Sequence, residues 1–205
     1  MQDNAPLFVT GIGTDVGKTI VTAILVEYFK ADYWKPVQSG DLDNSDTMKV
    51  QRLISNSTSK FYPEVYRLTQ PFSPHKSADL DGVEIDLDKI NVPDTANRLL
   101  IEGAGGLMVP LNYQETIVDL IQKLNAEVIL VVRHYLGSIN HTLLSLELLQ
   151  QKKIKVHTLI FNGHIDEYSE QIIKQHPAVG RVAYIPELTA VNPETVKQAA
   201  AKLVI

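Results

Sequence analysis

Residues 11–19 combine glycines, a lysine and a threonine at a spacing suited to binding phosphate. They read Gly-Ile-Gly-Thr-Asp-Val-Gly-Lys-Thr and directly follow residues 7–10, Leu-Phe-Val-Thr, which we predict to form a strand. Glycines let the backbone wrap closely around an anion, and the first N–H groups of a following helix point at it. We therefore predict that Lys18 contacts the β- and γ-phosphates of a nucleotide and that the Thr19 hydroxyl binds Mg²⁺.

The spacing of this loop departs from the standard phosphate-binding motif, in which four residues separate the two glycines. Five residues separate Gly11 from Gly17, and Ile12 stands at the ordinary glycine position. The spacing is closer to that of the loops in nitrogenase iron proteins and partitioning ATPases. Those loops often carry an early second lysine, where this chain has Gly13. A glycine-rich turn with a solvated lysine is the alternative interpretation.

Polar side chains also stand at the ends of two predicted strands. Lys35 and Ser39 lie at the end of the strand predicted over residues 33–37, and Glu102 ends the one predicted over 99–102. Open α/β sheets bind their ligands at the edge formed by the carboxyl ends of parallel strands. We predict that Lys35 lies near the γ-phosphate and that Glu102 binds Mg²⁺. The alternatives are a surface lysine and a solvated glutamate.

Asp46 is a further candidate for the magnesium site. It follows Asn44 and Ser45 directly before a predicted helix. An aspartate at a helix start commonly caps the helix or interacts with its dipole, so its functional interpretation depends on a magnesium ion nearby. Together, Thr19, Asp46 and Glu102 with the lysines outline a site that neutralises the charge of a transferring phosphoryl group.

The elements that must position these residues alternate along the chain. Predicted strands cover residues 7–10, 33–37, 99–102, 128–132, 157–161 and 182–185, and helical patterns cover 20–28, 139–149 and 193–204. This alternation is typical of βαβ units with a parallel sheet. We predict a single α/β domain over residues 1–205, a P-loop NTPase with a mostly parallel sheet and helices on both faces. Residues 69–94 hold three prolines and are expected to form an irregular surface segment that covers the site.

Composition excludes several classes of function. The chain has 205 residues, a formal charge of −5 and no cysteine. Disulfides, thiolate metal sites and cysteine nucleophiles are therefore excluded, and an acidic chain is poorly suited to nucleic acid. The first residues include Asp3 and no long apolar run, and residues 128–132 are too few to cross a bilayer. We expect a cytoplasmic protein that binds neither membrane nor nucleic acid.

Six motifs in order carry a resemblance to a known family. They are GTDVGKT, KPVQSG, NSD, SPH at residues 73–75, EGAGG, and LGSINH at residues 136–141. In these motifs the chain resembles the dethiobiotin synthetases, the ATP-dependent enzymes that close the ureido ring in biotin synthesis. The resemblance implies that 7,8-diaminononanoate, CO₂ and ATP give dethiobiotin, ADP and phosphate through a carbamate and a carbamic-phosphoric anhydride, with Mg²⁺ as cofactor.

The resemblance also implies roles for individual residues. Lys35 and Lys18 would be catalytic, and Ser39 would contact the substrate. The positions implied for nucleotide or metal binding are Asp15, Val16, Gly17, Lys18, Thr19, Asp46, Glu102, Gly103, Ala104, Gly105, Asn162, Gly163, Pro186, Glu187, Leu188 and Glu194, with Thr19, Asp46 and Glu102 at the magnesium ion. The interval from Pro186 to Glu194 is one residue longer than in familiar members.

The LGSINH motif is expected to begin a helix. The resemblance implies that Gly137, Ser138, Ile139 and Asn140 receive the substrate carboxylate across a homodimer interface, and helix N-termini attract anions. The alternative is that Ser138 caps the helix while Ile139 packs.

Two other functions share parts of this pattern. A regulatory partitioning-type ATPase would have the same fold, but the acidic chain and the missing loop lysine do not favour it. Glutamine-dependent cobyrinate synthases require a cysteine that this chain lacks. A nucleotide-binding module without turnover stays an alternative, because binding motifs do not demonstrate catalysis.

Overall fold

A parallel β-sheet forms the centre of the structure, a computed structural model that describes residues 5–205. Within these residues the main sheet has seven strands in the order β4-β2-β6-β1-β7-β8-β9, and every neighbouring pair is parallel. The strands are β1 (Leu7–Gly11), β2 (Asp32–Trp34), β4 (Phe61–Tyr62), β6 (Leu99–Gly106), β7 (Glu127–Val132), β8 (Val156–Asn162) and β9 (Val182–Ile185). β1 lies between β6 and β7, so the glycine-rich loop leaves the middle of the sheet.

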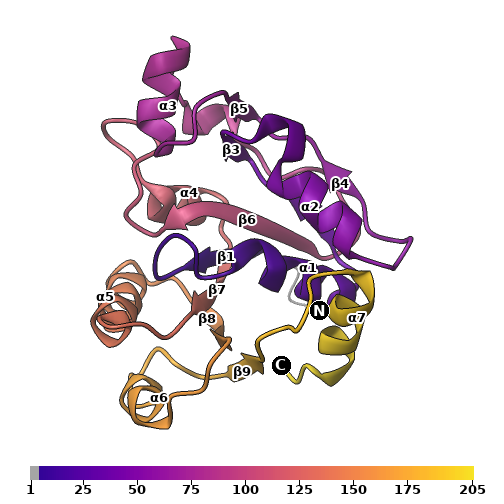
Figure 1. Ribbon diagram of the computed structural model, residues 1–205. Helices are drawn as coiled ribbons and strands as arrows, with labels where there is room; N and C mark the ends of the chain where they lie inside the picture. Colours follow the sequence, from indigo (N-terminus) through magenta and orange to yellow (C-terminus); the bar gives the residue numbers. More distant parts are fainter. Residues whose placement is uncertain (1–4) are drawn as a thin grey trace.

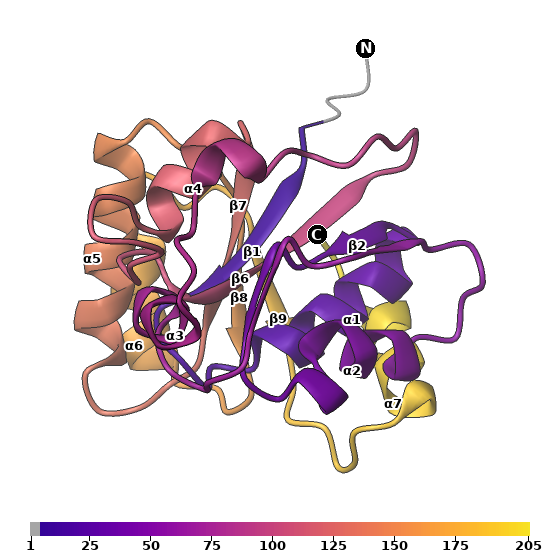
Figure 2. The same ribbon diagram turned by 90° about the horizontal axis from the view of Figure 1, so that it is seen from above.

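Helices cover both faces of this sheet, as predicted. Figure 2 shows α1 (Lys18–Phe29), α2 (Asp46–Leu53) and α7 (Pro193–Lys202) on one side, with α4 (Ile117–Lys123), α5 (Ser138–Gln151) and α6 (Glu167–Lys174) on the other. Residues 128–132 are fully buried, as expected for an apolar strand covered on both faces. The prediction of an α/β fold with a mostly parallel sheet is confirmed.

A small second sheet lies beside the main one. It pairs β3 (Val37–Ser39) with β5 (Tyr66–Leu68), and α3 (Pro74–Asp81) packs near it (Figure 1). The single strand predicted over residues 33–37 was therefore wrong, because Lys35 and Pro36 interrupt it and the chain changes sheets. Proline has no N–H for a strand ladder, which explains the break at this point.

Local sequence signals set several helix boundaries. Ser45 precedes α2 and its hydroxyl accepts the N–H of Met48. Asn192 and Thr195 form a capping box at α7, and proline occupies the first turn of both α3 and α7. Residues 69–94 thus contain a regular helix, and their prediction as irregular was wrong over Pro74–Asp81. The helix could have been predicted from Ser73 and Pro74, because a serine followed by a proline is a common helix start.

No helix within residues 5–205 combines the length and apolar composition needed to cross a bilayer. Asp3, which the sequence argument used at the N-terminus, lies outside the described residues.

Candidate active site

The glycine-rich loop connects the end of β1 to the start of α1. Gly17 is the last residue before α1 and has φ of 89°, a left-handed conformation that favours glycine. A Cβ at Gly17 would overlap with Nδ2 of Asn162, and one at Gly11 would overlap with the Val16 side chain. The loop therefore needs glycine at both positions, and the backbone N–H groups at the start of α1 are left facing the sheet edge.

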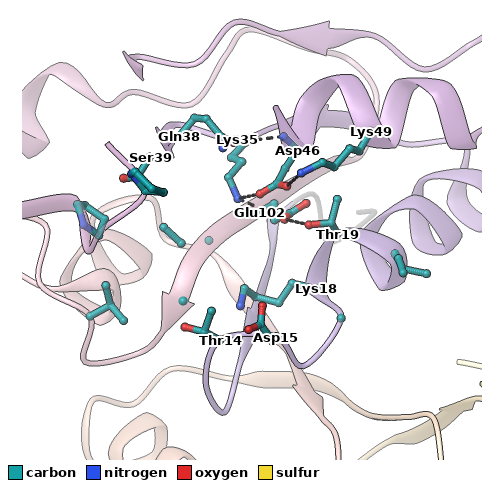
Figure 3. Close-up of a pocket in the computed structure, with 18 of the residues that line it drawn as sticks. Thr14, Asp15, Lys18, Thr19, Lys35, Gln38, Ser39, Asp46, Lys49 and Glu102 are labelled. Atoms are coloured by element: carbon teal, nitrogen blue, oxygen red, sulfur yellow. Dashed lines mark hydrogen bonds and ion pairs between the residues drawn. The ribbon is translucent and has the colours of Figure 1, made fainter. Parts of the chain in front are cut away.

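A cavity of about 990 Å³ lies over this edge of the sheet. Eleven of the predicted site residues line it: Asp15, Gly17, Lys18, Thr19, Lys35, Ser39, Asp46, Glu102, Gly103, Ala104 and Gly105. They come from the loop, from the ends of β2, β3 and β6, and from the start of α2 (Figure 3). The structure thus brings together residues that lie up to 90 positions apart in the sequence.

Glu102 is the centre of the polar contacts in this cavity. Its Oε1 accepts the Thr19 hydroxyl at 2.8 Å and lies 3.3 Å from the Lys35 ammonium. Its Oε2 accepts the Tyr33 hydroxyl at 3.0 Å. Only 1% of Glu102 is exposed, so these donors are needed to offset the loss of hydration of the carboxylate.

Lys35 links Glu102 to Asp46. Its Nζ lies 2.7 Å from Oδ2 of Asp46, whose Oδ1 lies 3.3 Å from Lys49 (Figure 3). Burial alone would lower the pKa of Lys35, but the charges of Glu102 and Asp46 outweigh it and raise this pKa. Burial likewise opposes ionisation of Asp46, yet Lys35 and then Lys49 lower its pKa. The raised pKa of Lys35 and the lowered pKa of Asp46 both favour a charged ion pair at neutral pH.

Lys18 is buried and lies within the phosphate loop. Its Nζ donates to the carbonyl oxygen of Gly13 at 3.0 Å. Burial, and then the charge of Lys35, lower the pKa of Lys18. An anion between these two lysines would relieve their repulsion, so the electrostatics of the cavity favour a phosphate.

Other predicted residues do not line the cavity. They are Val16, Gly137, Ser138, Ile139, Asn140, Asn162, Gly163, Pro186, Glu187, Leu188 and Glu194. Asn162 instead donates to the carbonyl oxygen of Val16 at 2.8 Å and so holds the phosphate loop. Gly137 precedes α5 as its N-cap, and Ser138 is buried without capping the helix through its side chain. The ligand roles implied for all of these residues stay predictions.

Sequence reasoning missed several residues that line the cavity. Lys49 and Arg52 follow Asp46 at intervals of three on α2, a spacing that places side chains on one helix face. Arg133 follows β7 at the same edge of the sheet, and its guanidinium lies 3.5 Å from the Glu187 carboxylate. Helix periodicity and the carboxyl-edge rule were signals that could have identified them.

Comparisons with known proteins agree with this arrangement. Residues 5–195 match the family model described as an AAA domain. The structural match to a chain of the MinC:MinD cell division protein complex of Aquifex aeolicus covers 95% of this chain and 86% of that chain, with a TM-score of 0.59 and 15% sequence identity. The match to a ParA family ATPase of Chlorobium tepidum covers 97% of this chain and 99% of that chain, with a TM-score of 0.52 and 14% sequence identity. At such identities, these likenesses show the fold alone.

Closer relatives are found among curated sequences. A protein of Christiangramia forsetii named ATP-dependent dethiobiotin synthetase is 51% identical over 95% of this chain and 94% of its own length. A protein of Cytophaga hutchinsonii with the same name is 46% identical over 96% of this chain and 95% of its own length. Because both similarities extend over nearly the whole of each chain, this protein belongs to the ATP-dependent dethiobiotin synthetase family.

Proposed function

We propose that this chain closes the ureido ring of dethiobiotin from 7,8-diaminononanoate and CO₂, using ATP. Family membership supports the reaction class. The observation that carries the residue assignment is the buried Lys35, which extends from the end of β2 toward the same cavity as the phosphate loop. A regulatory ATPase needs a cation for its phosphates, whereas a ring-forming enzyme must also hold a second anion beside them.

The reaction proceeds in three steps. One amine of the substrate attacks CO₂, loses a proton and becomes a carbamate. A carbamate oxygen then attacks the γ-phosphorus, the bond from that phosphorus to the β,γ-bridging oxygen breaks, and ADP leaves. Finally the second amine attacks the carbamate carbon, the bond from carbon to the phosphate oxygen breaks, and the ring closes with loss of inorganic phosphate and a proton.

Lys18 and Lys35 supply the charge that these steps require. A carbamate and a triphosphate repel each other, so fixed ammonium groups stabilise the crowded negative charge of the transition state. Lys18 interacts with the β- and γ-phosphates and Lys35 lies where the carbamate meets the γ-phosphate. Ser39 supports this assignment, because its buried hydroxyl oxygen has no hydrogen-bond partner within the described residues and the side chain lines the cavity. It contacts the bound substrate.

Mg²⁺ is the proposed cofactor, held by Thr19, Asp46 and Glu102 together with the nucleotide phosphates. These side chains supply one hydroxyl and two carboxylates, the hard oxygen donors that Mg²⁺ prefers, and nucleotide sites commonly use only one or two carboxylates. No group of three or more His, Asp and Glu side chains suited to a metal is found in residues 5–205. The ion would neutralise charge on the transferring phosphoryl group.

A homodimer is proposed to complete the substrate site. Two observations support it: Leu136 just before α5 and Leu144 within α5 are strongly exposed, and Gly137 to Asn140 do not line the cavity of their own chain. Exposed apolar side chains on one helix and directly before it are suited to contact with a second copy. Across that interface, the N-terminus of α5 receives the substrate carboxylate.

Isotope incorporation tests the proposed reaction. Purified protein is incubated with ATP, Mg²⁺, 7,8-diaminononanoate and ¹³C-bicarbonate, and the product is identified by mass spectrometry. We expect dethiobiotin with one ¹³C atom in the ureido carbonyl. ATP hydrolysis without this product would contradict the proposal.

Subunit complementation tests the shared site. Lys35→Gln and Asn140→Trp variants are each expected to be inactive, whereas co-expressed chains should regain part of the activity because one intact site forms in a mixed dimer. A monomer in sedimentation velocity, or no recovery in verified mixed dimers, would contradict the shared site.

A further inference from the structure

A buried tyrosine contacts the active-site carboxylate from outside the cavity. Tyr33 has no exposed surface, and its hydroxyl donates to Oε2 of Glu102 at 3.0 Å. Tyr33 is not among the residues that line the cavity, so it has no direct path to a bound ligand. Any contribution to the reaction must therefore pass through Glu102.

The strand geometry explains why this tyrosine reaches Glu102. β2 pairs with β6 in parallel, with Tyr33 opposite Leu100. Residues two apart on a strand project from the same face, so Glu102 projects from the same face of β6 as Leu100, the residue opposite Tyr33. The ring of Tyr33 packs against Phe61, with ring centroids 5.5 Å apart. The hydroxyl is thus held in place by the neighbouring strands.

The two oxygens of Glu102 have different partners. Oε1 contacts Thr19 and Lys35, which both line the cavity, whereas Oε2 receives the Tyr33 hydroxyl alone among the hydrogen bonds of the described residues. The phenol of Tyr33 supplies the proton of this hydrogen bond, and its ring is fully buried beside the carboxylate. A charged oxygen in such a buried place is poorly tolerated without a donor.

We propose that Tyr33 is a positioning residue that fixes the orientation of Glu102, so that Oε1 is directed toward Thr19 and the bound nucleotide and cation. This inference rests on the proposed function of Glu102 at the metal. Without the phenol, Oε2 loses its donor, and the carboxylate can rotate to share Thr19 and Lys35 between its two oxygens. Its affinity for a cation then falls, because a preoriented ligand becomes a mobile one.

The test compares Tyr33→Phe with a matched control, Tyr62→Phe. Tyr62 lies on β4 beside β2, and its hydroxyl also donates to a carboxylate, Oδ2 of Asp32, at 3.3 Å. Both variants lose one phenol oxygen that is hydrogen-bonded to an acid, but only one of these acids belongs to the site. ADP binding is measured by calorimetry with Mg²⁺ and with EDTA, and dethiobiotin formation is measured at saturating substrates.

We expect Tyr33→Phe to reduce severalfold the gain in ADP affinity that Mg²⁺ provides, and to lower kcat about tenfold, while ADP affinity in EDTA is unchanged. Tyr62→Phe should leave all three quantities as in the wild type. A purely structural role for Tyr33 would lower the unfolding temperature and leave the Mg²⁺ gain and kcat intact, which would overturn the proposal.

A double-variant cycle keeps the test decisive if Tyr33→Phe also reduces stability. In a Glu102→Gln background, Tyr33→Phe should have no further effect on the Mg²⁺ gain, and additive effects would overturn the proposal. The ADP measurement needs no 7,8-diaminononanoate. A chain with a Tyr33-dependent Mg²⁺ gain that forms no dethiobiotin would therefore contradict the proposed function and not the role of Tyr33.

Discussion

Replacing Lys35 by glutamine removes the positive charge that distinguishes a ring-forming active site from a site that binds only the phosphates of a nucleotide. The ammonium lies 2.7 Å from Asp46 and 3.3 Å from Glu102, and its pKa is raised, so it is charged throughout the usual assay range. Glutamine keeps much of the side-chain volume and a donor group but carries no charge. The variant therefore tests electrostatics more than packing.

Two magnitudes follow from this geometry. Loss of one preorganised group that stabilises developing charge costs about 10²–10³-fold in kcat, or roughly 3–4 kcal/mol. Removing one partner of a buried ion pair costs about 3–5 kcal/mol of stability. We expect the lower end, about 3 kcal/mol, because Asp46 keeps Lys49 at 3.3 Å and its side chain is 22% exposed. ADP affinity should fall much less than the rate, because the loop contacts are intact.

The assay measures dethiobiotin formation beside calorimetric ADP affinity, with thermal unfolding to verify the folded state. Lys49→Gln is the matched control, since it removes a lysine from the same Asp46 carboxylate but not the one beside Glu102. Lys35→Arg should also be impaired, because a planar guanidinium does not fit the space of a compact ammonium. Near-normal product formation by folded Lys35→Gln would refute the catalytic assignment.

Three further predictions concern the loop, the sheet and the segment beside the cavity. Lys18→Ala should weaken ATP binding about tenfold or more, since it removes a buried cation from the phosphate loop; an unchanged dissociation constant in calorimetry would count against this. Burial opposes ionisation of Asp32, but donors from Lys60, Thr95, Asn97 and Tyr62 outweigh it and lower its pKa. Ionised Asp32 therefore adds stability that is fully present above the ordinary pKa of aspartate and is lost as the pH falls through the lowered pKa of the folded state. Asp32→Asn should destabilise the fold by about 1–3 kcal/mol at pH 7. In urea titrations, this variant should also lose less stability on acidification than the wild type. Gly40→Ala should raise the KM for 7,8-diaminononanoate, because the added Cβ would displace Pro71, which lines the cavity. Gly40 has φ of 67°, and a Cβ there would lie 2.6 Å from Cβ of Pro71. An unchanged KM would argue that this segment does not contact the substrate.

Much of the site could be predicted from sequence because its elements follow local rules. A β-branched run, a glycine-rich loop and Gly-Lys-Thr before a helix fix one end of the cavity without knowledge of distant contacts. The carboxyl-edge rule then brings Lys35 and Glu102 to the same place once their strands are parallel. Asp46 joins them because Ser45 starts α2 where Lys35 can reach it.

The parts that sequence did not predict depend on contacts between distant segments. Pro36 accounts for the break after Trp34, but no local pattern in residues 33–37 specifies that the chain then pairs β3 with β5 in a second sheet. The sequence predicted Tyr33 only as part of a strand, because its hydrogen bond depends on the register of β2 against β6. Strand register is a tertiary property, so a residue that acts through it carries no local motif.

The most direct test of the proposed function is the co-substrate dependence of phosphate release. Inorganic phosphate and dethiobiotin are measured together with ATP and Mg²⁺, while 7,8-diaminononanoate and bicarbonate are each omitted in turn from CO₂-depleted buffer. We predict one phosphate for each dethiobiotin in the complete mixture and almost none when either co-substrate is absent. Equal phosphate release in all mixtures would contradict the account and identify the chain as an ATPase without ring-closing activity.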